Sequence, residues 1–136
     1  MTSRPRRLAD LARDSTGSAP VEFVLVGVVL TLLTLAIIQF GIAVYVRNVV
    51  HDAAVEGAHV AALADTNVAE GADRTRTVIA RTVGEGFAQD VSVRDTERLG
   101  YPAVEVRVRT TLPLIGLIGV PWALEVSAHA PAESLD

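Results

Sequence analysis

The sequence of 136 residues contains no cysteine. Disulfide bonds, thiolate metal sites and cysteine nucleophiles are therefore excluded. Lysine is absent as well, because every basic residue is an arginine. A phosphate-binding loop of the Walker type needs a lysine and follows a strand, whereas Gly84-Glu85-Gly86 follows a predicted helix. The sequence thus offers no loop of the kind that binds a nucleotide.

Residue constellations typical of enzymes are also missing. The three histidines, His51, His59 and His129, form no His-x-x-x-His pair, and no serine stands in a Gly-x-Ser-x-Gly setting. Asp52, Glu56 and His59 fall along one face of a predicted helix, but such a row is usually a solvated surface and seldom a metal site. We therefore predict no metal, no cofactor, no small-molecule substrate and no enzymatic activity. A membrane-tethered hydrolase is the least favoured class of function.

The charges are unevenly distributed along the chain, whose formal net charge is −4. Residues 1–17 contain four arginines and two aspartates, so the rest of the chain is more acidic than the whole. An acidic remainder argues against binding to nucleic acid, which needs a concentrated basic surface. An arginine-rich leader before an apolar segment predicts a cytoplasmic N-terminus by the positive-inside rule.

The apolar run from Phe23 to Val46 is the strongest signal in the sequence. It contains no charged residue, and Gln39 is its only strongly polar side chain. A helix of this length spans about 36 Å, enough to cross a hydrocarbon layer of about 30 Å. We predict a membrane-spanning helix over residues 18–46, with a cytoplasmic leader at 1–17 and an extracytoplasmic domain at 47–136.

The helical pattern continues beyond the membrane to about Ala64, since no proline interrupts it and apolar residues recur at helical spacing. Ala53, Gly57 and Ala61 form a ridge of small residues, which lets a second helix approach closely. The same ridge is equally consistent with a segment that is simply rich in alanine.

A second helix is predicted to begin after Asn67, which forms a capping box with Glu70, and to end near Gly86. The remainder has the period-2 pattern of strands at residues 91–94, 104–109 and 122–129, with a turn over 95–102. In the last strand the alternation places Trp122 on one face with Leu124, Val126 and Ala128.

The predicted fold class is α+β: a long N-terminal transmembrane helix, then a second amphipathic helix packed on a small antiparallel sheet of about three strands. The second helix offers the long apolar stripe that the sheet needs as a cover. Residues 113–121 are too apolar for an ordinary surface loop. They are either a buried connection or an exposed patch that meets the membrane or a partner.

The entrance to the apolar run has a recognisable form. Gly17-Ser18-Ala19-Pro20-Val21-Glu22-Phe23 resembles the processing site of TadE-like proteins, pseudopilins of tight-adherence (Flp-type) pilus systems. The stretch Ala53-Ala54-Val55-Glu56-Gly57-Ala58 resembles the segment that follows the membrane helix in that family, and Pro113-Leu114-Ile115-Gly116-Leu117 resembles a later one. Pro20, Val55 and His59 depart from the usual family residues. A plainer interpretation of Glu22 is that it complements the dipole at the start of a helix.

The resemblance implies that a prepilin peptidase cuts between Gly17 and Ser18, which makes Glu22 the fifth residue of the mature chain. The partners of the protein would be the lipid bilayer, the peptidase and other pilins or pseudopilins, in the cell membrane or in a surface pilus. The new ammonium at Ser18 and the carboxylate of Glu22 would neutralise each other within or between chains. The alternative is a signal-anchored single-pass protein, never cut at Gly17, whose outer domain binds a ligand or partner.

Overall fold

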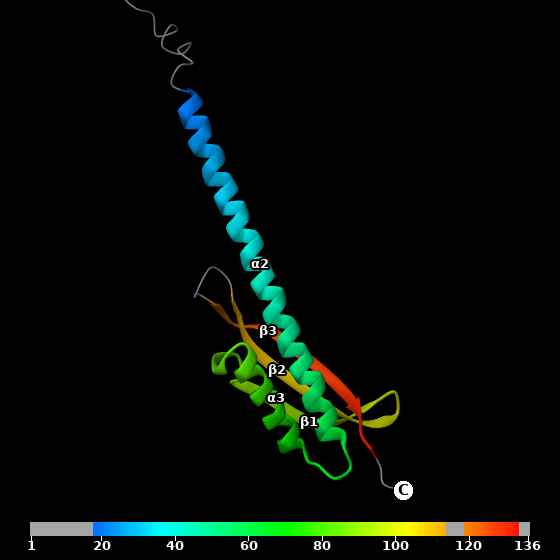
Figure 1. Cartoon of the computed structure of the whole chain (residues 1–136). Coiled ribbons are helices and arrows are strands. Elements are labelled where there is room, and N and C mark those ends of the chain that lie inside the picture. The colour runs from blue at the N-terminus through cyan, green and yellow to red at the C-terminus, as the bar shows by residue number, and fades with distance from the viewer. Residues whose placement is uncertain (1–17, 114–118, 134–136) are drawn as a thin grey trace, which may run out of the picture. The chain divides into compact units, whose positions relative to one another are not determined.

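The computed structural model describes residues 18–113 and 119–133. The elements in chain order are α2 (Ser18–Ala62), α3 (Val68–Thr82), the short 3-10 helix η2 (Glu85–Phe87), β1 (Asp90–Arg98), β2 (Tyr101–Pro113) and β3 (Gly119–Pro131). The strands form one antiparallel sheet in the order β1-β2-β3 (Figure 1). The predicted α+β class, with helices first and antiparallel strands after them, is confirmed. By its internal contacts the chain divides into two units, residues 1–38 and 39–136.

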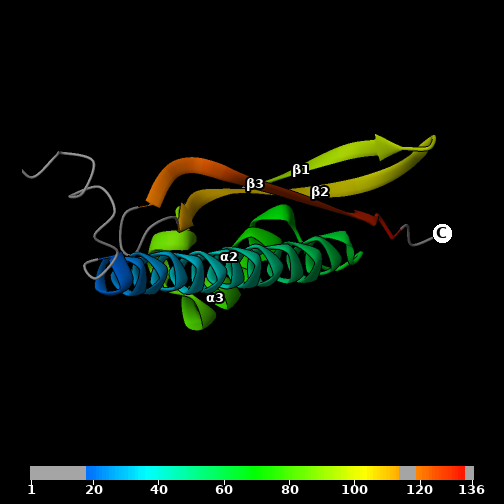
Figure 2. The same cartoon turned by 90° about the horizontal axis from the view of Figure 1, so that it is seen from above.

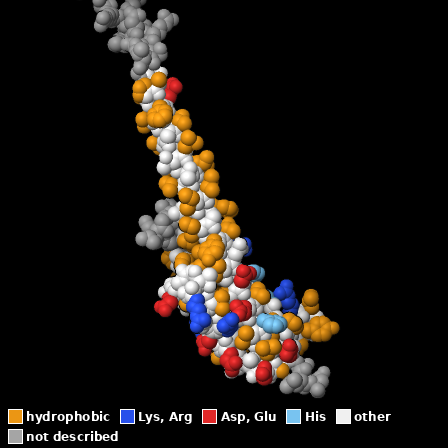
Figure 3. Space-filling view, in the orientation of Figure 1, with side chains coloured by type: hydrophobic (Ala, Val, Ile, Leu, Met, Phe, Trp, Pro, Cys, Tyr) orange, Lys and Arg blue, Asp and Glu red, His pale blue; other side chains and the backbone are white. Residues whose placement is uncertain are grey.

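The described part of the first unit, residues 18–38, is helical and exposed along its whole length. By length and composition α2 is able to cross a membrane. Its two threonines do not interrupt the apolar surface, because the hydroxyls of Thr31 and Thr34 donate to the carbonyls of Gly27 and Leu30, each at 2.8 Å. Hydrophobic side chains follow the visible face of this helix in Figure 3.

The core of the second unit lies between one face of the sheet and two helices. Residues of α2 are buried from Val46 onward at helical spacing, and they share a core with Ile79 of α3 and with the inward side chains of β2 and β3. Figures 1 and 2 show this part of α2 and α3 on the same side of the sheet. The sequence analysis expected α3 to cover the apolar face of the sheet. In the structure α3 covers this face together with the C-terminal part of α2.

Helix α3 begins where the sequence predicts and ends earlier. The side-chain oxygen of Asn67 accepts hydrogen bonds from the backbone N–H groups of Ala69 at 2.9 Å and Glu70 at 3.1 Å, so Asn67 is the N-cap. The helix stops at Thr82 rather than near Gly86. Gly84 has a φ of 112°, which no right-handed helix contains, so η2 follows as a separate turn.

The first hairpin is tighter than predicted. The turn expected over residues 95–102 is only Leu99-Gly100, and residues 95–98 continue β1, with Arg98 opposite Tyr101. Leu99 and Gly100 have φ values of 55° and 82°, as a two-residue hairpin turn requires. Asparagine or glycine is usual at the first position, and leucine there conceals the turn in the sequence.

The predicted position of Trp122 is wrong. Leu124, Val126 and Ala128 are buried as expected, but the Trp122 side chain is 60% exposed. Trp122 has a φ of 59°, and the pairing of β2 with β3 shifts register between Thr110 and Leu112. A left-handed residue breaks the alternation of an extended strand, so the face of Trp122 does not follow from that of its neighbours.

The cap at Asn67 gives a first prediction. Asn67→Ala removes the acceptor of two backbone donors and should lower the free energy of unfolding by about 1 kcal/mol, whereas Asn67→Asp should retain most of the stability. Urea unfolding of the detergent-extracted chain measures this, followed by the fluorescence of Trp122, the only tryptophan. Equal midpoints for Asn67→Ala and the unchanged protein would contradict the assignment.

Candidate functional site

The predicted processing segment lies at the beginning of α2. Gly17 is outside the described residues, while Ser18 is the first residue of the helix and Glu22 lies one turn later. Residues four apart lie on the same side of a helix, so the Ser18 backbone nitrogen and the Glu22 side chain belong to one face. Glu22 is exposed, with exposed apolar neighbours on both sides.

The ridge of small residues predicted on α2 lies in the second unit. A Cβ atom built on Gly57 would lie 1.8 Å from Oγ1 of Thr75 and 2.7 Å from the carbonyl oxygen of Gly71. A Cβ on Gly71 would lie 2.5 Å from that of Ala61. Gly57 and Ala61 therefore lie directly against α3, and Ala53 is fully buried in the core. Only glycine at residues 57 and 71 permits this separation of the helices.

An ion pair stands beside the glycine contact. Nε of Arg74 on α3 donates to Oε1 of Glu56 on α2 at 2.8 Å. Glu56 belongs to the row of Asp52, Glu56 and His59 that the sequence places on one helix face. Among the described residues, no three or more acidic or histidine side chains come together in a way that could hold a metal ion.

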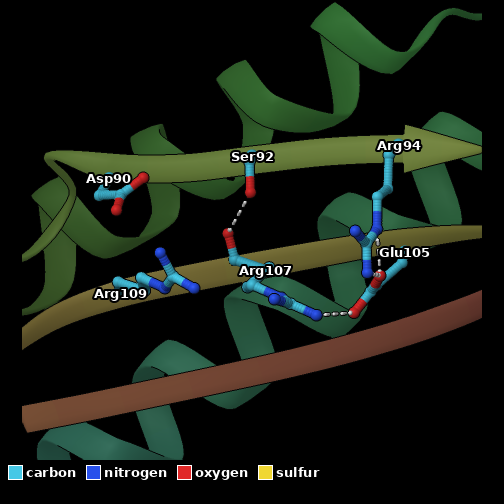
Figure 4. A pocket seen from close by; sticks show the side chains of 6 residues that line it. All are labelled: Asp90, Ser92, Arg94, Glu105, Arg107 and Arg109. Atoms are coloured by element: carbon cyan, nitrogen blue, oxygen red, sulfur yellow. Dashed lines mark hydrogen bonds and ion pairs between the residues drawn. The ribbon is translucent and has the colours of Figure 1, made fainter.

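The outer face of the sheet, away from the helices, carries a row of alternating charges that the sequence analysis missed. Cross-strand register places Arg94 opposite Glu105, and Arg109 opposite Glu125. Glu105 contacts Arg94 and also Arg107, whose Nη2 lies 3.0 Å away. Glu125 accepts from Nε of Arg109 at 3.0 Å. The charges of β1, β2 and β3 thus pair with one another across the sheet. Figure 4 shows the contacts of Glu105 with Arg94 and Arg107.

Glu105 is the centre of this row and is only 4% exposed, whereas Arg107 on the same face is half-buried and Arg109 is exposed. Burial raises the pKa of its carboxyl group. Hydrogen bonds from Arg107 and Arg94, together with their charges, lower the pKa by more than burial raises it, so the pKa lies below its ordinary value. His129 adds a third neighbour, with Nε2 at 3.8 Å. Glu105 is therefore ionised at neutral pH and is poorly suited to transfer protons.

A shallow cavity of about 170 Å³ lies over this row and is lined by Asp90, Ser92, Arg94, Glu105, Arg107 and Arg109 (Figure 4). Its arginines are largely engaged by carboxylates of the same sheet. Alternation at residues 105, 107 and 109 places these side chains on one face in the sequence. Which residues of β1 and β3 pair with them depends on the register of the strands, and the sequence does not reveal that register. This geometry supports a structural ion network.

A comparison with protein families finds a match in the N-terminal part of the chain. A family model described as TadE-like protein matches residues 17–59. This segment resembles TadE-like proteins. The resemblance inferred from the entrance to the apolar run is confirmed over that range. The TadE-like segment covers about a third of the chain, from Gly17 through the apolar helix to Gly57 and its contact with α3, and stops before α3 and the sheet. No curated protein and no solved structure matches the chain.

The close contact at Gly57 gives a second prediction. Gly57→Ala places a methyl group against backbone and should lower the free energy of unfolding, because overpacking costs about 1–3 kcal/mol. Gly41→Ala in the same helix is the matched control, since it adds the same methyl group where nothing lies within 4 Å. Both changes gain the helix preference of alanine, about 1 kcal/mol, so their difference isolates the clash. Equal urea midpoints would contradict the close approach.

The buried carboxylate gives a third prediction, on pH. The pKa of Glu105 is lowered in the folded state, so its ionised form stabilises the fold above the unfolded-state pKa. This contribution is lost as the pH falls through the lower, folded-state pKa. Glu105→Gln should therefore lower the urea midpoint at neutral pH, and the gap to the unchanged protein should narrow as the solution is acidified.

The control for this measurement is Glu97→Gln, at an exposed position near the end of β1. It should leave the urea midpoint nearly unchanged at neutral pH. A gap between Glu105→Gln and the unchanged protein that stays constant from neutral to acidic pH would show that the charge of Glu105 does not stabilise the domain.

Proposed function

We propose that the chain is a TadE-like minor pilin or pseudopilin that acts in the assembly of a tight-adherence pilus or a related secretion apparatus. The observation that carries this proposal is the match over residues 17–59. It joins a glycine–glutamate entrance to an apolar helix long enough to cross a membrane. The matching family is a structural one. The internally paired charges of the sheet fit the same kind of role, because Glu105 and Glu125 are both engaged by arginines.

In this proposal a prepilin peptidase removes the leader, residues 1–17, after Gly17. Ser18 then carries the new N-terminal ammonium group, and Glu22 lies one helical turn away on the same face. Opposite charges at a similar depth attract strongly where the surroundings exclude water, while an uncompensated charge there is costly. The ammonium of Ser18 and the carboxylate of Glu22 neutralise each other either within one chain or between neighbouring chains. Pairing between chains favours assembly.

The topology follows from the same proposal. Residues 1–17 lie in the cytoplasm by the positive-inside rule, residues 18–46 span the cell membrane, and residues 47–136 lie outside. The outer domain provides contacts to other pilins or pseudopilins, and the bilayer is the partner of the exposed apolar helix.

The fourth prediction tests processing in the native host. Intact mass and N-terminal sequencing of the membrane-extracted protein should give a chain that begins at Ser18. Gly17→Ala should leave the leader attached, because the peptidase requires glycine before the cut. Glu22→Ala should still be cut, but less of it should be recovered in sheared or extracted pilus assemblies.

The matched control is Gly27→Ala, a glycine of the same helix with open space around it. Its mature mass should differ from the unchanged protein only by the added methyl group. A chain from the unchanged gene that retains Arg13 and the rest of the leader would overturn the pilin-like assignment. The signal-anchored module, with an outer domain that binds a ligand or partner, would then become the leading interpretation.

A further inference from the structure

The exposed tryptophan at the start of β3 has no explanation in the core. Trp122 is 60% exposed, and its flanking residues Pro121 and Ala123 are exposed as well. Its left-handed backbone is an unusual conformation for a bulky residue, which the surrounding structure must hold in place. It lines a hollow with Asp90, Arg109 and Glu125, all from the outer face of the sheet. A large aromatic side chain held out of the core in this way points to a partner outside the chain.

The position of Trp122 along α2 follows from the hollows between α2 and β3. One is lined by residues 47–51 of α2 and by residues 125–127 of β3. The next is lined by residues 52–60 of α2 and by residues 129–131 of β3. Strand β3 therefore runs along this part of α2 in the same direction, as Figure 1 also shows. Trp122 precedes Glu125 by three residues, up to about 10 Å toward the apolar run at about 3.3 Å per residue.

That distance corresponds to about seven residues of a helix at about 1.5 Å each. Trp122 thus lies level with about residues 40–45 of α2, where the helix is still apolar and most side chains are exposed. Tyr45 stands in this stretch and is exposed, and Arg47 is the first charged residue after it. Tyrosine, tryptophan and arginine together are typical of the boundary between hydrocarbon and lipid headgroups.

We propose that the end of the domain formed by the close of β2 and the start of β3 rests on the outer membrane–water boundary, with Trp122 inserted among lipid headgroups as an anchor. The occupant is lipid rather than a second copy, because the level of Trp122 coincides with the last lipid-exposed turns of α2. The contact holds the domain against the bilayer. The inference depends on α2 crossing the membrane, as in the proposed function, and does not depend on processing or on a pilus.

The fifth prediction uses Trp122 as its own probe, since the chain has no other tryptophan. The full chain is reconstituted into phosphatidylcholine vesicles at several protein-to-lipid ratios. Trp122 emission should lie at shorter wavelength than that of an exposed tryptophan. Lipids brominated high in the acyl chain should quench it more than lipids brominated near the bilayer centre.

The matched control moves the tryptophan to the opposite end of the sheet. Tyr101 is 72% exposed beside the first hairpin turn, about ten residues or roughly 30 Å along β2 from the level of Trp122. In the double variant Trp122→Phe with Tyr101→Trp, the tryptophan should emit at long wavelength. Neither brominated lipid should quench its fluorescence. The emission of a tryptophan at this end should indicate surrounding water, whereas that of Trp122 should indicate surrounding lipid.

The outcomes separate this inference from the proposed function. If the chain fails to float with the vesicles, α2 does not span the membrane and the proposed function fails with it. If the chain floats but brominated lipids quench Trp122 no more than the control, the lipid contact is overturned while the span stands. Emission that shifts to shorter wavelength only at high protein density, without lipid quenching, would assign Trp122 to a second copy and would equally overturn the proposal.

Discussion

The structure depends on a change of surroundings along one helix. From residue 18 to residue 38, α2 is exposed on every side, and from Phe23 onward this stretch carries no charged side chain. From Val46 onward one face is buried against α3 and the sheet, and the residues there become small. Because Gly57 and Gly71 have no Cβ, the two helices approach closely and together cover a sheet that neither could cover alone. The helix that is long and apolar enough to cross a membrane is therefore also part of the core of the domain.

The other face of the sheet is stabilised in a different way. Its side chains are charged, and register pairs them across the strands, so that Glu105 is buried beneath arginines without losing its charge. Glu105 and Glu125 on this face are both paired with arginines of the same sheet.

The main departures from the sequence-based predictions lie at three residues whose φ is positive. Leu99 enters the left-handed region in a turn, and Trp122 does so at the start of a strand. Gly84, with a positive φ, ends α3 before its apolar pattern is exhausted. Helices and strands were predictable because their periodicity is local. These three positions were not, because the conformation of each is held by the elements around it.

The sequence alone determined the membrane-length helix, the cap at Asn67, the α+β order and the TadE-like entrance, since each is written in residues that are neighbours along the chain. Only the tertiary structure decided that Gly57 meets Gly71, that Glu105 is surrounded by arginines of two strands, and that Trp122 leaves the core. Those contacts join segments far apart in the chain. They depend on strand register and helix separation, which the packing of the whole domain sets and which no local pattern records.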